Sequence, residues 1–78
     1  DMQELKIIMD AIHQLPARCK LIFRLIKEEG LSYREAADTM GLSVKTIENQ
    51  MNIAFRRLFE IAQKNGLLFR NKAKKRFP

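Results

Sequence analysis

Side chains whose polar groups match the edges of nucleic-acid bases recur around residues 44–56. On a helix with Ile47 at 0°, Lys45, Asn49, Asn52 and Arg56 fall at about 160°, 200°, 140° and 180°, with Glu48 near 100°. Asparagine can bridge adenine, glutamate can accept from N4 of cytosine, and lysine or arginine can reach guanine or a phosphate. A solvated face is the alternative. The amides Asn49, Gln50 and Asn52 favour base reading, because solvated faces are more often rich in Glu and Lys.

These side chains need a long helix to hold them, and the sequence predicts one over about residues 44–65, roughly 33 Å at 1.5 Å per residue. Its core stripe has helical spacing and comprises Ile47, Met51, Ala54, Leu58 and Ile61. Ser43 is the predicted N-cap, and Gly66 ends the helix. A brief helix over about residues 33–40 precedes it, opened by a capping box that runs from Ser32 to Glu35.

The two helices and the turn between them, residues 41–43, form a helix-turn-helix arrangement. Ala37 is small where the helices cross, and Gly41 can take the positive φ of a sharp turn. Leu42 fills the core from the turn, while Ile47 and Met51 anchor the second helix against the first. An ordinary helical hairpin is the alternative, but this combination of residues favours DNA binding.

Backbone phosphates have candidate partners at the starts of the same two helices. The N-termini at Ser32 and Ser43 offer free backbone N–H groups and the positive end of a helix dipole. Arg34 lies on the first turn after Ser32, and Arg56 lies on the outer face of the long helix. We expect these four residues to contact phosphates, although Arg34 is also consistent with an ordinary surface arginine.

The first part of the chain predicts two further helices. Over about residues 2–14, one face carries an apolar stripe of Leu5, Ile8, Met9, Ile12 and Leu15. The next helix begins at Leu15-Pro16, since proline suits a first helical turn, and ends near Gly30. Its stripe is Cys19, Ile22, Phe23 and Ile26, widened by Leu21 and Leu25. No β pattern competes, so we expect an all-α fold: about four helices in a three- to four-helix bundle of the winged-helix-like, helix-turn-helix class.

Composition limits the class of protein, and the net charge is unevenly distributed along the chain. The chain has 78 residues and one cysteine, Cys19, which excludes an internal disulfide scaffold. Its longest apolar runs are far below the roughly 18 residues that a membrane span needs, so we expect no membrane insertion. The net charge is +6, but residues 67–78 hold five bases and no acid, which leaves 10 bases against 9 acids elsewhere. We therefore divide the chain into a nearly neutral domain, residues 1–66, and a basic tail, residues 67–78, which we interpret as a solvated arm.

Three runs of sequence occur in an order that is typical of one family. They are LPARCKLIF from Leu15 to Phe23, EEGLSYREAA from Glu28 to Ala37, and MGLSVKTIENQM from Met40 to Met51. Together they resemble region 4 of bacterial sigma factors, most closely the extracytoplasmic-function type. The resemblance extends over about residues 5–62.

The resemblance implies a four-helix domain whose last helix enters the major groove at the promoter −35 element. Carried over by position, the residues that would face the bases are Lys45, Thr46, Glu48, Asn49 and Asn52. Ser32, Arg34 and Ser43 would meet phosphates. The resemblance also implies docking of the first two helices on the flap of the RNA polymerase β subunit, inhibition by an anti-sigma factor, and a location in the bacterial cytoplasm.

Departures from the family pattern qualify these expectations. Ala36 stands where the family usually has a branched aliphatic residue, which predicts looser packing. Ile53 is apolar and, by its place on the helix, leans outward where the family usually has a base, so no phosphate contact is expected there. The family's region 2, which melts the −10 element, is absent, so we expect the chain to be a fragment of a larger protein.

Other functions fit the sequence less well. A LuxR-type response-regulator domain usually opens with Leu-Thr-x-Arg-Glu, which is absent, whereas the Leu15-Pro16 entry and Phe23 favour a sigma factor. A protein-interaction module that never meets DNA stays open, because residues 1–66 are nearly neutral. An enzyme has little support: His13 is a lone histidine near Asp10, and Cys19 on an apolar stripe is a small buried residue. No metal-ligand spacing occurs, so we expect neither a metal nor a cofactor.

Overall fold

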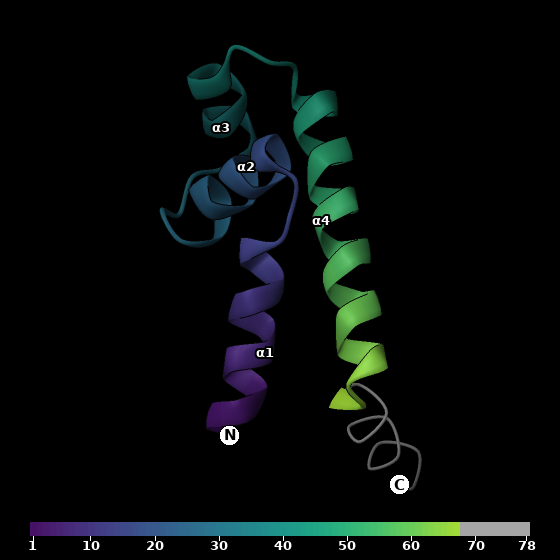
Figure 1. The fold of residues 1–78 in the computed structure, drawn as a ribbon. Helices are drawn as coiled ribbons and strands as arrows, with labels where there is room; N and C mark the ends of the chain where they lie inside the picture. Colours follow the sequence, from purple (N-terminus) through teal and green to yellow (C-terminus); the bar gives the residue numbers. More distant parts are fainter. Residues whose placement is uncertain (68–78) are drawn as a thin grey trace, which may run out of the picture.

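Four helices joined by short turns make up residues 1–67, the part of the chain that the computed structural model describes. They are α1 (Met2–His13), α2 (Ala17–Lys27), α3 (Tyr33–Met40) and α4 (Val44–Lys64). In Figure 1, α1 runs beside the C-terminal half of α4, α2 crosses α4 near its middle, and α3 lies near its N-terminal end. Residues 1–67 contain no β-strand. The expected all-α fold of about four helices is confirmed.

Hydrogen-bonded caps set where α3 and α4 begin. The Ser32 hydroxyl accepts from the Glu35 N–H at 3.0 Å, and the Glu35 carboxylate accepts from the Ser32 N–H at 2.8 Å. This is the reciprocal capping box that the sequence predicts. At α4, the Ser43 hydroxyl accepts from the Thr46 N–H at 3.0 Å. A serine cap contributes about 1 kcal/mol to helix stability, so both starts are fixed by local sequence.

The turn between α3 and α4 depends on the freedom of Gly41. Its φ is +69°, a left-handed conformation that glycine adopts without a Cβ clash. The Leu42 N–H donates to the Ala37 carbonyl at 2.9 Å, and the Gly41 N–H donates to the Asp38 carbonyl at 3.3 Å. These two bonds form a Schellman motif, which brings the residue after the glycine back onto the helix. Leu42 accordingly packs against the core.

The core is centred on α4, which contacts all three other helices. Ile47, Met51 and Ala54 are at most 1% exposed, and they share one cluster with Cys19, Ile22 and Phe23 of α2. Ala36 and Ala37 of α3 are buried in the same cluster. Burial of one large aliphatic side chain contributes about 1.5–3 kcal/mol, so this cluster is what holds the helix-turn-helix pair on α2.

The apolar stripe that the sequence predicts for α1 is confirmed at its C-terminal end, where Leu15 is buried and Ile12 packs against the core, and is wrong at two other positions. Leu5 and Met9 are 55% and 44% exposed, whereas Ala11, outside the predicted stripe, is 3% exposed. Ala11 lies close to α4, where it lines a cavity of about 120 Å³ together with Arg57 and Ile61. The reason is that α1 is apolar around much of its girth, so two stripes compete. Because Ala11 is small, α1 can approach α4 closely along the side that carries Ala11.

Two smaller expectations also need correction. Ile53 does not lean outward: it is half-buried and packs against the core, because its branched side chain reaches back from the flank of α4. Pro16 is the N-cap of α2 rather than part of the first turn, since its ψ of 147° is extended and the helix begins at Ala17.

The basic tail predicted for residues 67–78 falls almost entirely on residues 68–78, which lie outside the described part of the chain. Within residues 1–67, none of the helices has both the length and the apolar character needed to cross a membrane.

Candidate nucleic-acid interface

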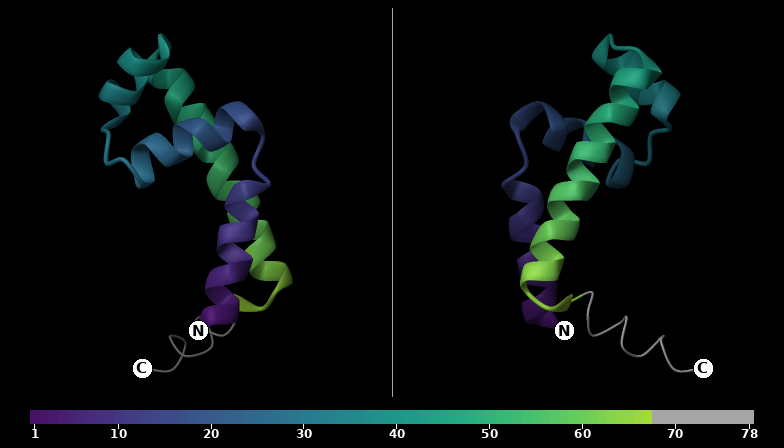
Figure 2. Two further views of the ribbon diagram at one scale, coloured as in Figure 1. Left: turned by 60° about the vertical axis from the view of Figure 1, so that its left-hand side comes forward. Right: turned by 90° about the vertical axis from the view of Figure 1, so that its right-hand side faces the viewer.

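The side of α4 that faces away from the core is polar over its first three turns. Lys45, Glu48, Asn49 and Asn52 are all exposed, as is Arg56 farther along the helix. Ile47, on the opposite side of the helix, is 0% exposed. Because Ile47 is buried in the core, the polar side of α4 faces solvent. The right-hand view of Figure 2 shows α4 in front of the other helices, with no helix covering it from that side. The structure therefore brings these five predicted residues together on one accessible surface.

Two of the predicted base-reading side chains pair with each other. Lys45 Nζ lies 4.0 Å from Glu48 Oε1, and the two side chains are 79% and 49% exposed. An exposed ion pair of this kind is worth about 0–1 kcal/mol. The pair can therefore separate at little cost, which leaves a cation and a carboxylate one turn apart for neighbouring bases.

Thr46 and Gln50 do not join the polar side of α4. Thr46 is half-buried, and its hydroxyl accepts a hydrogen bond from the Ser43 hydroxyl at 3.0 Å. Gln50 is half-buried on the core side, where its backbone carbonyl accepts from the Cys19 thiol at 3.3 Å. Of the three clustered amides, only Asn49 and Asn52 are presented outward. Thr46 is part of the cap that precedes them.

The N-termini of α3 and α4 differ in charge although both carry a serine cap. The first-turn N–H groups of any helix lack acceptors within the helix, so they can bind an anion. At α3 the Glu35 carboxylate already occupies this end, 2.8 Å from the Ser32 nitrogen. The first turn of α4 contains no acid. The N-terminus of α4 is therefore the better phosphate site. At α3, the exposed Arg34 of the first turn carries a positive charge that offsets the charge of Glu35.

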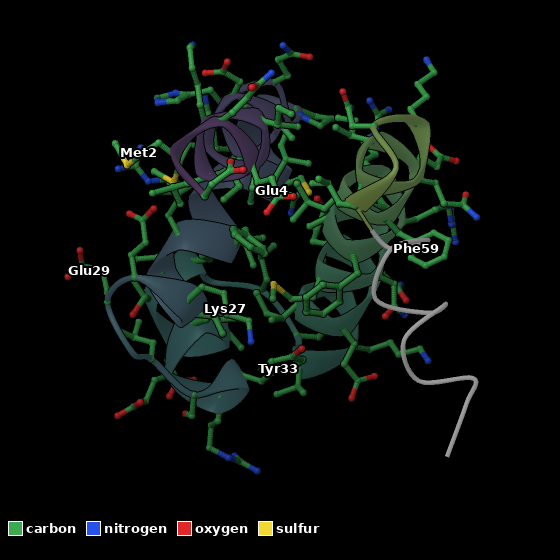
Figure 3. All side chains as sticks on the ribbon, turned by 90° about the horizontal axis from the view of Figure 1, so that it is seen from below. Met2, Glu4, Lys27, Glu29, Tyr33 and Phe59 are labelled. Carbon is green, nitrogen blue, oxygen red and sulfur yellow. The ribbon has the colours of Figure 1, made fainter. Side chains whose placement is uncertain are left out.

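Two exposed aromatic side chains lie on α4 at the edge of this surface, and the sequence interpretation missed them. Phe55 and Phe59 are 43% and 52% exposed. The Phe55 ring meets Phe23 edge-on at 6.3 Å between centroids, and the Lys27 ammonium lies 5.7 Å from the Phe55 centroid. Figure 3 shows Phe59 pointing away from the helices that face α4. On a helical wheel with Ile47 at 0°, these two phenylalanines fall at about 80° and 120°, on either side of Glu48. These angles already place them beside the polar side of α4.

Cys19 is buried and serves packing. Burial raises the pKa of the Cys19 thiol above its ordinary value, and the charge of Arg57 opposes this only in part. The thiol stays protonated at neutral pH and donates to the Gln50 carbonyl, which ties α2 to α4. The prediction of a small buried residue is confirmed.

The histidine and aspartate of α1 are not arranged as an acid–base pair. The Asp10 carboxylate pairs with Lys6 Nζ at 3.1 Å. His13 is exposed, and its backbone carbonyl accepts from Lys20 Nζ at 3.1 Å. In the described part of the chain, no three His, Cys, Asp or Glu residues are grouped so that they could hold a metal ion.

Comparison with known proteins places the helix-turn-helix in a family. The family model for Sigma-70, region 4 matches residues 5–58, which include most of α1, all of α2 and α3, and most of α4. Searches of curated proteins and of solved structures give no match. The matched segment contains the cap of α3, the Gly41 turn and the polar side of α4. The chain belongs to the Sigma-70 region 4 family.

Proposed function

We propose that this domain recognises the promoter −35 element as part of a bacterial sigma factor of the extracytoplasmic-function type. The observation that carries the proposal is the exposed amide and basic side of α4, held outward by buried Ile47 in a Sigma-70 region 4 chain. A major groove about 12 Å wide admits one helix. Family membership favours this function over a LuxR-type domain.

Base reading is assigned to the first three turns of α4. Asn49 and Asn52 would each bridge an adenine, Glu48 would accept from a cytosine amino group, and Lys45 would reach a guanine. Glu48 and Lys45 exchange their weak mutual ion pair for these contacts. Thr46 contributes from the flank through its own hydroxyl hydrogen, because the hydroxyl oxygen accepts from Ser43.

Phosphate contacts are assigned to the ends of this surface. Ser43 and the N-terminal N–H groups of α4 meet one strand, with Ser32 and Arg34 of α3 beside them. Arg56 lies about 16 Å along the axis from Lys45 at 1.5 Å per residue. Since the groove is about 12 Å wide, a helix whose first turns meet bases holds Arg56 near the groove edge, where phosphates lie.

Protein partners complete the proposed function. The flap of the RNA polymerase β subunit would dock on the apolar outer surface of α1 and α2, where Leu21 is 50% exposed. An anti-sigma factor would compete for the domain, and both would act in the bacterial cytoplasm. Because residues 1–66 carry 10 bases against 9 acids, we expect the isolated domain to bind DNA weakly. Attachment to the polymerase would supply a high effective concentration at the promoter.

The test is selection of duplexes that bind the domain, followed by comparison of Asn49→Ala with the parent chain. We expect Asn49→Ala to lose about 1–3 kcal/mol of binding free energy on the selected duplex and almost none on a scrambled one. Gln63→Ala is the control, because Gln63 is an exposed amide of α4 about 21 Å beyond Asn49 along the axis.

Two outcomes would count against the proposal. Equal losses on the selected and scrambled duplexes would show that Asn49 does not read a base. Failure to enrich any duplex, with binding to the polymerase flap retained, would favour a protein-interaction module, the alternative that the nearly neutral domain keeps open.

A further inference from the structure

One cationic side chain from outside the helix-turn-helix pair lies against α4, next to the candidate interface. Lys27 is the last residue of α2 and is exposed. Its ammonium lies 5.7 Å from the centroid of the Phe55 ring. That ring meets the buried Phe23 edge-on, with 6.3 Å between centroids and 79° between planes. Phe55 is therefore anchored on the core through Phe23, and it holds the charge of Lys27 at the surface of α4.

The position of Phe55 on α4 decides what Lys27 can reach. With Ile47 at 0° on a helical wheel, Phe55 falls at about 80°, between the buried stripe and Asn52 at about 140°. Phe55 follows Asn52 by less than one turn, about 4.5 Å along the axis. The Lys27 ammonium therefore lies on the flank of α4 that borders the proposed base-reading residues. When these residues face the bases of a groove about 12 Å wide, this flank faces one edge of the groove, where phosphates lie.

An aromatic partner leaves the charge of Lys27 available. None of the ion pairs within residues 1–67 includes Lys27. The neighbouring Glu28 pairs with Arg24 at 2.8 Å, and Figure 3 shows Glu29 pointing outward while Lys27 points across toward α4. A carboxylate partner would neutralise the ammonium, whereas a ring attracts it through its quadrupole and leaves the positive charge in place. The three N–H donors of a lysine also allow it to contact the ring and an anion at the same time.

We propose that Lys27 binds a phosphate of the promoter duplex while its ammonium stays over Phe55, which acts as a positioning residue. The ring restricts a flexible four-carbon side chain before DNA arrives, so less side-chain entropy is lost on binding. The contact extends the DNA-binding surface from the helix-turn-helix pair to the end of α2. This assignment rests on the proposed function for the orientation of α4 in the groove, whereas a phosphate contact itself is independent of base sequence.

The first test removes the charge of Lys27 in the full 78-residue chain. Lys27→Gln should lower the log–log slope of DNA affinity against salt by about 0.9, and equally on the selected and the scrambled duplex, because phosphates are common to both. Arg18→Gln is the matched control and should leave the slope unchanged. Arg18 is also exposed on α2, but it lies about 14 Å from Lys27 along the axis and on the opposite side of that helix.

Asn49→Ala separates this contact from base reading. If Asn49→Ala weakens only the selected duplex and Lys27→Gln leaves both slopes unchanged, the phosphate role of Lys27 is overturned and the proposed function stands. If Lys27→Gln lowers both slopes while Asn49→Ala has no effect, the phosphate contact stands and base reading by Asn49 does not. An equal loss of slope in Arg18→Gln would show a general effect of net charge and would overturn the contact. A parent chain that binds neither duplex at low salt would overturn both proposals.

The second test asks whether Phe55 acts through Lys27. Phe55→Leu removes the aromatic ring but keeps an apolar side chain against Phe23, so it should weaken duplex binding about two- to fivefold. Phe55→Tyr keeps a ring and should bind like the parent chain. In the Lys27→Gln background, Phe55→Leu should have no further effect, since the ring then has no ammonium to position. An equal loss in both backgrounds, or tighter binding by Phe55→Leu, would overturn the positioning role.

Discussion

The helix-turn-helix pair, α3 and α4, and the preceding pair, α1 and α2, are built by similar means but present different outer surfaces. Both pairs bury one side in the core, where α4 contacts α1, α2 and α3. The free side of α4 carries Asn49, Asn52 and charged residues over its first turns. The free sides of α1 and α2 carry Leu5, Met9 and Leu21 instead.

This difference indicates that the two pairs meet different kinds of partner. Hydrogen-bonding side chains suit base edges and phosphates, whereas exposed aliphatic side chains suit another protein surface. A core residue in α4 should therefore matter for stability, an outer residue of α4 for DNA, and an outer residue of α1 for neither. Three changes, of decreasing expected effect, test whether the two pairs differ in this way.

The largest effect is expected from Ile47→Ala in the helix-turn-helix core. Ile47 is 0% exposed, so the change leaves a cavity between α4 and its neighbours and should lower the free energy of unfolding by about 2–5 kcal/mol. Leu5→Ala, at a 55% exposed position of α1, should change it by less than about 0.5 kcal/mol. Thermal melts would decide, because 1 kcal/mol shifts the Tm of a domain this size by about 4–8 °C.

Two results of the thermal melts would contradict this assignment of core and free surfaces. If Ile47→Ala left the Tm unchanged, Ile47 would not be buried and the orientation of α4 would be wrong. If Leu5→Ala lowered the Tm as much as Ile47→Ala, the apolar surface of α1 would be part of the core and not a free surface.

The contrast between α4 and α1 also explains what the sequence could predict. In α4, Ile47, Met51 and Ala54 form one apolar stripe opposite a polar side, so only one orientation buries the stripe and exposes the charges. The start of α3 was equally predictable, because the Ser32–Glu35 capping box is a local interaction. The turn at Gly41 was predictable for the same reason, because it depends only on the positive φ of Gly41 and on the hydrogen bond from the Leu42 N–H to the Ala37 carbonyl.

The features that the sequence could not predict depend on contacts with other helices or with the loop. In α1, the stripe with Leu5 and Met9 competes with the side that carries Ala11, and only the distance to α4 selects Ala11. A helical wheel puts Ile53 outside the core stripe because it takes no account of the neighbouring helices, whereas in the structure Ile53 packs against the core. The position of Leu31 also depends on a neighbour, because the hydrogen bond from its N–H to the Leu25 carbonyl returns the loop to the end of α2.

A smaller effect is expected from removal of the basic tail, residues 67–78. Apart from that of Lys27, the proposed phosphate contacts lie on α3 and α4, but the tail holds five of the 15 bases of the chain. We expect its deletion to flatten the dependence of DNA affinity on salt, by about 0.9 in the log–log slope for each lost phosphate contact. Titrations at several salt concentrations measure the slope. Equal slopes for the truncated and intact chains would leave the helices as the source of all phosphate contacts.

The smallest effect is expected from Glu35→Gln at the start of α3. Glutamine can also accept from the Ser32 N–H, so the capping box is kept while its charge is removed. A carboxylate about 8 Å from a phosphate in water opposes it by about 0.5 kcal/mol. The change should therefore raise duplex affinity about twofold at low salt, and the gain should vanish at high salt. Glu60→Gln, the same change at an exposed position in the C-terminal half of α4, should have no effect. If the two variants bind alike, the start of α3 lies away from the DNA backbone, and the acid-free N-terminus of α4 is the phosphate site of the pair.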